Sequence, residues 1–195
     1  MSFRIACLLV LFGWSASAFA QELTKSEVSG GLSYLHSNTA DGICGCFSLL
    51  GGSGSFVLNA NQKLSGVVDV GYQRASNVNS TGIDLGLFTF MAGPRLSFRG
   101  QKITLFGQVL AGGVHSHSNS TFNNANGFAG SAGAGVDLRL TSRFSWRILQ
   151  MDYLLTRVPN GVNNVQNNVR LTTGIVIRLG SMPPQGPHRP YNRPY

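Results

Sequence analysis

Residues 169–180, VRLTTGIVIRLG, alternate between two kinds of side chain. The largely apolar set comprises Val169, Leu171, Thr173, Ile175, Ile177 and Leu179. The set between them comprises Arg170, Thr172, Gly174, Val176 and Arg178. A repeat of two residues is the period of a β-strand, whose successive side chains point to opposite faces. The pattern therefore predicts a strand with one apolar face and one face that carries arginine.

Seven further segments alternate in the same way, so the chain is expected to form eight strands. They span residues 26–36, 52–60, 63–74, 84–99, 102–115, 127–140, 143–156 and 168–179. The predicted connections alternate between tight turns at 61–62, 100–101 and 141–142 and long loops at 37–51, 75–83, 116–126 and 157–167. Short turns at one end and long loops at the other are typical of a transmembrane barrel.

Charged residues fall repeatedly on the polar faces of these segments. They are Asp69, Arg95, Asp137, Arg139, Asp152, Arg170 and Arg178. In a soluble sandwich these residues would meet water; in a closed barrel they would point into the lumen, with the apolar faces towards lipid. Closure removes every open strand edge, side chains fill an eight-stranded lumen, and buried charges must pair. We therefore expect an all-β fold, an eight-stranded antiparallel up-and-down transmembrane β-barrel, with a structural charge network in its lumen.

Two features depart from the simple pattern. Phe144 and Trp146 share the parity of the inward residues Gln150 and Asp152, and a β-bulge between Trp146 and Leu149 would correct this. Pro94 removes one backbone donor from its strand. Neither departure outweighs the alternation of the other segments.

The two ends of the chain differ from the middle. Arg4, an apolar run and the small residues Ala18-Phe19-Ala20 predict a signal peptide over 1–20, cleaved before Gln21. Residues 21–180 form the predicted barrel domain. Residues 181–195 are rich in proline and basic, and we expect them to form a disordered periplasmic tail.

The formal net charge of +8 raises the question of nucleic acid as a partner. No cluster of Lys and Arg lies on a helical face, and several cations lie at alternating strand positions or in the tail. We therefore expect no nucleic-acid partner.

Cleavage of the signal peptide would remove Cys7 and leave Cys44 and Cys46 in an oxidising compartment. A disulfide between them would close a very small loop around Gly45 and would be strained. This bridge is an open alternative. A metal site is weaker, because two thiolates need further ligands.

Histidines on the long-loop side carry two further alternatives. His36, His115 and His117 could join the two cysteines in a metal site, but loop histidines are usually solvated. His115 and His117 with nearby serines could indicate a lipid hydrolase, but nucleophile, base and orienting acid must all be present. We expect neither a catalytic site nor a metal or other cofactor.

Five stretches together resemble a known family. They are VSGGLSYL at 28–35, FMAGPRLSFR at 90–99, AGVDLRL at 134–140, QMDYLLTR at 150–157 and NNVRLTTGIVIRLG at 167–180. Their order and spacing resemble the small eight-stranded outer-membrane β-barrels of the OmpA transmembrane-domain and OmpX type. The resemblance implies a bacterial outer-membrane location. Such barrels serve as anchors, adhesins, invasion factors and occasionally enzymes.

The most favoured function is that of a non-enzymatic integral outer-membrane barrel with a structural or surface-interaction role. Its partners would be outer-membrane lipid, lipopolysaccharide and an extracellular ligand bound by the loops at 37–51, 75–83, 116–126 and 157–167, and it would be a monomer. A lipid A deacylase-like enzyme is the second hypothesis, and a narrow pore is the third.

Overall fold

The structure is a computed structural model that describes residues 24–38, 47–76, 84–118, 124–158 and 164–181. These residues form eight β-strands, one for each predicted segment. The strands are β1 (Thr24–Asn38), β2 (Phe47–Asn59), β3 (Leu64–Ala75), β4 (Leu85–Arg99), β5 (Ile103–Ser118), β6 (Ala125–Arg139), β7 (Phe144–Arg157) and β8 (Gln166–Ser181). The predicted signal peptide, Cys44, Cys46 and residues 182–195 lie outside the described residues.

The eight strands form one closed antiparallel barrel in the order β1 to β8. Each strand pairs with its neighbours in sequence, and β1 closes the barrel against β8, with Val28 opposite Ile177. The predicted fold class is therefore confirmed, and closure leaves no open sheet edge. No helix in the described part of the chain is long and apolar enough to cross a membrane.

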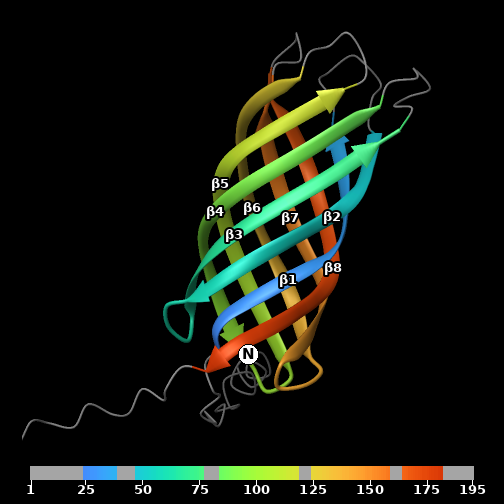
Figure 1. Cartoon of the computed structure of the whole chain (residues 1–195). Coiled ribbons are helices and arrows are strands. Elements are labelled where there is room, and N and C mark those ends of the chain that lie inside the picture. The colour runs from blue at the N-terminus through green and yellow to red at the C-terminus, as the bar shows by residue number, and fades with distance from the viewer. Residues whose placement is uncertain (1–23, 39–46, 77–83, 119–123, 159–163, 182–195) are drawn as a thin grey trace, which may run out of the picture.

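The two ends of the barrel differ. The three short connections lie together at the lower end of Figure 1, which we call the turn end. The strand ends that border 39–46, 77–83, 119–123 and 159–163 lie at the opposite end, which we call the loop end (Figure 1). The strands slope strongly across the barrel axis, as closure of a sheet requires (Figure 1).

The short connections are longer than the predicted two residues. They span residues 60–63, 100–102 and 140–143. In the first of them, the side-chain oxygen of Asn61 accepts hydrogen bonds from the backbone N–H groups of Lys63 (2.9 Å) and Leu64 (2.8 Å). An Asn side chain that bonds the following backbone in this way stabilises a turn wider than two residues.

Three of the four long loops are shorter than predicted, because several strands continue towards the loop end, whereas the connection between β3 and β4 keeps its predicted length. β2 begins at Phe47 instead of residue 52, and β5 continues to Ser118. Polar side-chain pairs hold these extensions together across the strands. Tyr34 Oη lies 2.6 Å from Ser48 Oγ, for example. Such pairs are not visible in the apolar pattern, which therefore underestimated the strands.

Exposure alternates along the strands as the sequence predicts. In β3 the side chains of Leu64, Val68, Val70 and Tyr72 are exposed, whereas those of Ser65, Val67, Asp69 and Gln73 are buried. β8 likewise exposes Ile175 and buries Arg170 and Thr172. The apolar face is outward and the arginine-bearing face is inward.

The β7 strand contains the predicted bulge. Its pairing with β6 passes from Leu149 opposite Val136 to Arg147 opposite Asp137, so Ile148 is an extra residue. Ile148 and Leu149 are both exposed, and Trp146 faces outward. The bulge thus returns the aromatic residues before it to the outer face.

Pro94 interrupts the β4–β5 ladder without shifting it. The pairs Ala92–Ala111 and Arg95–Gln108 share one register, and the two residues between them on β4 have no partner on β5. The missing N–H of proline accounts for this gap.

The loop half of the interior is packed with apolar side chains. The inward residues there include Leu35, Leu49, Leu87, Met91, Leu110, Val114 and Leu154, which belong to one buried cluster. They come from β1, β2, β4, β5 and β7. The barrel therefore has a hydrophobic core inside it, above the charged residues described below.

Substitution of Leu110 by Ala tests this core. Leu110 is 2% exposed and its neighbour Val109 is 61% exposed, on the opposite face. We expect Leu110→Ala to lower the free energy of unfolding in detergent micelles by about 2–5 kcal/mol, because it leaves a cavity. Val109→Ala is the matched control and should change it much less. Equal losses in urea titrations would contradict an apolar interior.

Candidate functional site

The guanidinium of Arg170 lies at the centre of the barrel interior. Its side chain is fully buried, with 0% exposed. Nη1 donates to Asp69 Oδ1 on β3 at 2.9 Å, and Nη2 donates to Asp152 Oδ2 on β7 at 3.0 Å. Because β3 is not adjacent to β8 in the barrel, the bond to Asp69 crosses the lumen. One arginine thereby links three strands.

Asp152 gathers donors from three strands. Besides Arg170, it accepts hydrogen bonds from Gln108 Nε2 (3.2 Å) and Gln150 Nε2 (2.7 Å). A carboxylate out of water is stable only with such compensation. The two glutamines extend the ionic contacts into one connected polar network.

Arg147 forms the second buried ion pair, which the sequence analysis missed. Its Nε donates to Asp137 Oδ1 at 2.9 Å, and its Nη1 donates to Gln150 Oε1 at 2.8 Å. By parity with the outward residues Met151 and Tyr153, Arg147 would face outward. The bulge reverses that parity. Arg147 could have been identified from the sequence only by reassigning the inward and outward faces of every residue before the bulge.

Two of the arginines lie against one buried aromatic ring. The guanidinium carbons of Arg95 and Arg147 lie 4.2 Å and 4.7 Å from the centroid of the Phe106 ring. Arg95 also donates to Gln108 Oε1 from Nε (3.0 Å) and Nη2 (2.7 Å). Arg95 is thus held by the amide of Gln108 and the ring face of Phe106. It forms no ion pair with any of the described residues.

Inward glycines make room for this network. A Cβ on Gly133 would collide with the carboxylate of Asp152, and one on Gly135 would collide with the ring of Phe106. The alternating glycines of β6 are therefore required by the large side chains that lie against them.

A third cluster lies at the turn end. Arg99 Nη2 donates to Glu27 Oε1 at 3.2 Å and to Asn59 Oδ1 at 2.8 Å. Ser65 Oγ donates to the same Asn59 oxygen at 2.6 Å. The cluster joins β1, β2, β3 and β4. Glu27 and Arg99 were not among the residues singled out from the sequence.

The seven charged residues expected in the lumen thus fall into two groups. Asp69, Arg95, Asp137, Asp152 and Arg170 are buried in the middle of the barrel and lie in one network with Arg147. Arg139 and Arg178 are half-buried near the turn end.

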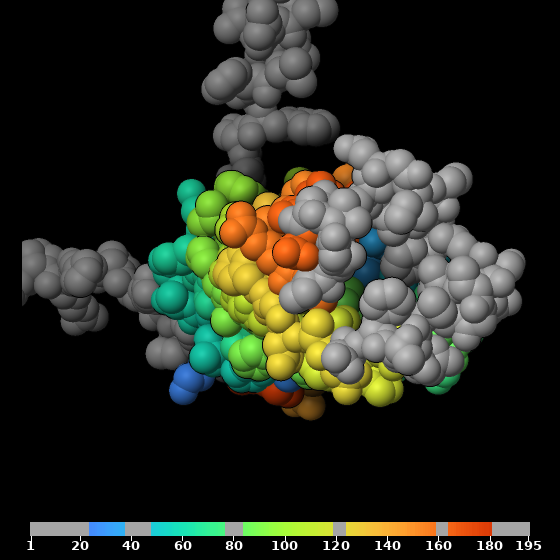
Figure 2. Space-filling model, turned by 90° about the horizontal axis from the view of Figure 1, so that it is seen from above, coloured from blue at the N-terminus to red at the C-terminus, as the bar shows by residue number. Residues whose placement is uncertain are grey.

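The interior is nearly full. A cavity of about 10 Å³ lies among Ser29, Ser55, Asp69, Arg147 and Gln150. This volume is close to the minimum that holds one water molecule. Figure 2 shows the molecule from the loop end. A cavity of about 10 Å³ is too small to form a channel.

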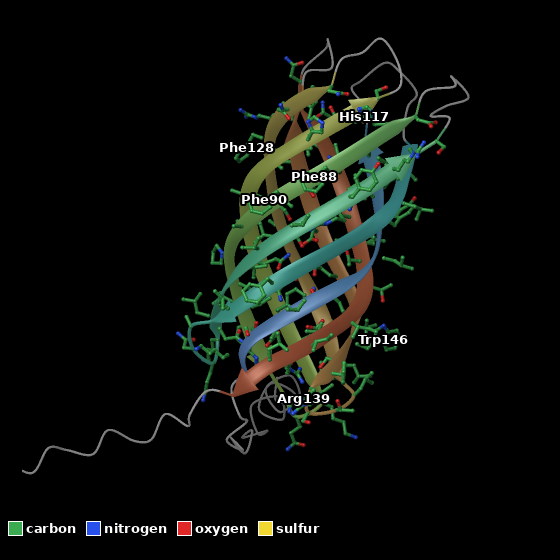
Figure 3. The ribbon with its side chains drawn as sticks, viewed as in Figure 1. Phe88, Phe90, His117, Phe128, Arg139 and Trp146 are labelled. Carbon is green, nitrogen blue, oxygen red and sulfur yellow. The ribbon has the colours of Figure 1, made fainter. Side chains whose placement is uncertain are left out.

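Outward polar side chains pair across the strands at the loop end. His115 Nδ1 lies 2.7 Å from Asn126 Oδ1, and His117 Nδ1 lies 2.7 Å from Asn124 Oδ1. Tyr153 Oη donates to Asn167 Oδ1 at 2.7 Å. In Figure 3, His117 lies near the loop end of β5. These pairs form a rim of hydrogen-bonding groups.

The arrangement of these histidines bears on the two chemical alternatives. His115 and His117 contact amide oxygens, and His36 Nδ1 lies 3.4 Å from Ser48 Oγ. Within the described residues, none of these three contacts is to a carboxylate. A hydrolase site would also need a nucleophile and an acid that orients the histidine. Within the described ranges, no three His, Cys, Asp or Glu side chains are placed to hold a metal ion.

Breaking the Arg170 contacts tests the network. We expect Arg170→Met to lower the free energy of unfolding by about 3–5 kcal/mol, because Asp69 and Asp152 lose their buried cation. The double variant Arg170→Met/Asp69→Asn should recover part of the loss, since Asp152 keeps its two glutamine donors. Urea unfolding followed by tryptophan fluorescence measures both. A single variant as stable as the parent protein would contradict this account.

The fold is similar to that of several solved structures. The sequence matches no family model and no curated protein. Among solved structures, Neisserial surface protein A (NspA) has a TM-score of 0.62 at 13% identity, over 80% of this chain and 98% of that chain. Ail, the attachment invasion locus protein of Yersinia pestis, has a TM-score of 0.56 at 15% identity, over 80% of this chain and 99% of that chain.

A second structure of Ail, in complex with the heparin analogue sucrose octasulfate, has a TM-score of 0.52 at 17% identity, over 80% of this chain and 99% of that chain. At these identities the similarity is one of architecture. The chain has the fold of the small eight-stranded outer-membrane β-barrels.

Proposed function

We propose that the protein is a non-enzymatic integral barrel of the bacterial outer membrane, with a structural and surface-interaction role at its loop end. The observation that carries this proposal is an exposed apolar belt to which every strand contributes. One member from each strand is Leu32, Phe56, Val70, Phe90, Val109, Phe128, Met151 and Ile175. In water such a belt would promote aggregation, whereas it is the surface expected of a barrel that spans a hydrocarbon layer.

Aromatic residues support the proposal by their height on the barrel. Phe88, Phe90 and Phe128 lie towards the loop end, whereas Trp146 lies towards the turn end (Figure 3). Aromatic side chains are enriched at both interfaces of a bilayer.

The filled interior favours a structural role over a pore. The lumen holds ion pairs, glutamines and an apolar core, and the cavity among its polar residues has space for about one water molecule. Because β1 closes on β8 of the same chain, the barrel needs no second copy, and a monomer is the simplest assembly.

The loop end is the surface at which we expect a ligand. Its described side chains are mostly neutral hydrogen-bonding groups, and one of its two arginines, Arg74, pairs with Asp84 at 2.7 Å. The similar protein Ail was solved with a polysulfated sugar. The described loop end here better fits a neutral polar ligand, beside lipopolysaccharide in the surrounding leaflet.

Export and orientation complete the proposal. Residues 1–20 act as the signal peptide, and an even number of strands places both ends of the barrel chain at the turn end. The turn end therefore faces the periplasm, together with the proline-rich tail from residue 181. The loop end faces the exterior.

Insertion predicts that the cost of an outward charge depends on depth. Ile175 lies near the middle of β8 and is 57% exposed, and Leu179 lies near its turn end and is 44% exposed. In lipid vesicles, Ile175→Arg should cost about 2–4 kcal/mol of folding free energy and Leu179→Arg about 0–1 kcal/mol. In a soluble barrel both changes would be mild. Equal, small effects would end the membrane proposal.

Orientation can be tested on cells. A short epitope tag inserted between residues 119 and 123 should be bound by an antibody on intact cells, because this segment follows β5 at the exterior end. The same tag between Thr141 and Ser142 is the matched control and should react only after the outer membrane is permeabilised. Reversed accessibility would show that the barrel lies the other way.

A further inference from the structure

The three short turns repeat one pattern. The last residue of each turn is a cation, and the first residue of the next strand is a large exposed hydrophobic side chain. The pairs are Lys63-Leu64, Lys102-Ile103 and Arg143-Phe144. All three cations are exposed. A positive charge therefore lies directly beyond the edge of the apolar belt at three places around the barrel.

Backbone hydrogen bonds hold these three residues at the turn end of the barrel. The carbonyl oxygen of Lys63 accepts from Ser97 N at 2.7 Å, that of Lys102 accepts from Arg139 N at 2.7 Å, and that of Arg143 accepts from Arg178 N at 2.8 Å. Each cation is thus anchored to the strand beyond its own hairpin. The side chain of each residue is exposed to solvent, but its backbone is held at a defined height along the barrel axis.

Four further cations lie at the same end. Arg99, Arg139 and Arg178 lie near the turn ends of β4, β6 and β8, and Lys25 is exposed at the start of β1. Figure 3 shows Arg139 at this end of the barrel. Arg99, Arg139 and Arg178 are partly buried on the lumen side of their strands, so we give the name basic rim to the four exposed cations: Lys25, Lys63, Lys102 and Arg143.

The charge of the basic rim is not balanced by the described residues around it. Among the described residues, Glu27 near this end pairs with Arg99 and Asp137 pairs with Arg147, so neither carboxylate forms an ion pair with the basic rim. In the middle of the lumen three aspartates face three arginines, and the loop end carries Arg74 and Arg157 against Asp84. The excess positive charge is therefore concentrated at the turn end.

We propose that the basic rim binds the phosphate groups of anionic phospholipids in the leaflet that surrounds the turn end. This inference rests on the proposed membrane insertion. Phospholipid phosphates lie just outside the hydrocarbon layer, which is the height of a cation next to Leu64, Ile103 or Phe144. Basic residues at this height attract anionic headgroups.

The distribution of the rim favours lipid over a single macromolecular partner. Its exposed cations occur at all three turns and at β1, and so they surround the barrel instead of forming one patch. Lipid headgroups surround a barrel in the same way. A rigid partner such as a cell-wall strand would meet only part of the ring.

The test uses the full chain, without its signal peptide, in phosphatidylcholine vesicles that contain a trace of spin-labelled phosphatidylglycerol or spin-labelled phosphatidylcholine. The motionally restricted fraction of each label measures lipid at the barrel perimeter. We expect a selectivity of roughly threefold to fivefold for phosphatidylglycerol at low ionic strength, and a loss of selectivity in concentrated salt.

Two variants separate the rim from charge in general. Lys63→Gln/Lys102→Gln/Arg143→Gln should abolish the selectivity, whereas Arg74→Gln/Arg157→Gln at the loop end is the matched control and should keep it. Heat-dependent gel mobility verifies that each variant is folded. Selectivity that survives in the triple variant, or is absent from the inserted parent protein, would overturn the inference.

A cell-wall partner would give a different result. The parent protein would then show no preference for phosphatidylglycerol, and it would sediment with peptidoglycan sacculi in a manner that depends on the three turn cations. This result would also overturn the inference. Failure of the protein to insert into vesicles would instead contradict the proposed function.

Discussion

The buried guanidinium of Arg170 is the contact on which the interior depends, because it holds Asp69 and Asp152 from two other strands at 2.9 Å and 3.0 Å. Closing a sheet places charged side chains from opposite walls within reach of each other, where little water can solvate them. In such surroundings an ion pair is strong and an unpaired charge is very costly. The closed barrel and its ion pairs therefore require each other: closure brings the partners together, and their pairing makes closure tolerable.

Glycines and a β-bulge, which weaken single strands, make room for the side chains of this interior. Gly133 leaves space for the Asp152 carboxylate, and the extra residue Ile148 in β7 turns Arg147 inward towards Asp137. Glycine and bulges weaken an isolated strand. Here each admits a large polar or aromatic group that the opposite wall supplies, so the local loss is offset by contacts across the lumen.

Alternation and turn spacing were sufficient to predict eight strands, their faces and the burial of Asp69 and Arg170, because all of these are local properties. The partners were not predictable in this way. Which inward residues meet depends on the stagger of the closed barrel, and that is a global quantity. Arg147 was missed for a local reason, since one bulge reverses the parity of the residues before it. The ends of the strands were misjudged where polar pairs such as Tyr34–Ser48, and not apolar residues, hold them.

Charge varies with height along the barrel, and this gradient restricts where the protein can act. The turn end is basic, the middle of the lumen is balanced, and the loop half of the lumen is apolar, with Leu110 and Leu154 among its buried residues. The apolar half keeps water from the ion pairs below it, which strengthens them. The described interior contains little free space, so the surfaces that we propose for binding are the outer wall and the two rims. These rims differ in kind: one carries mainly neutral hydrogen-bonding groups, and the other carries a ring of cations.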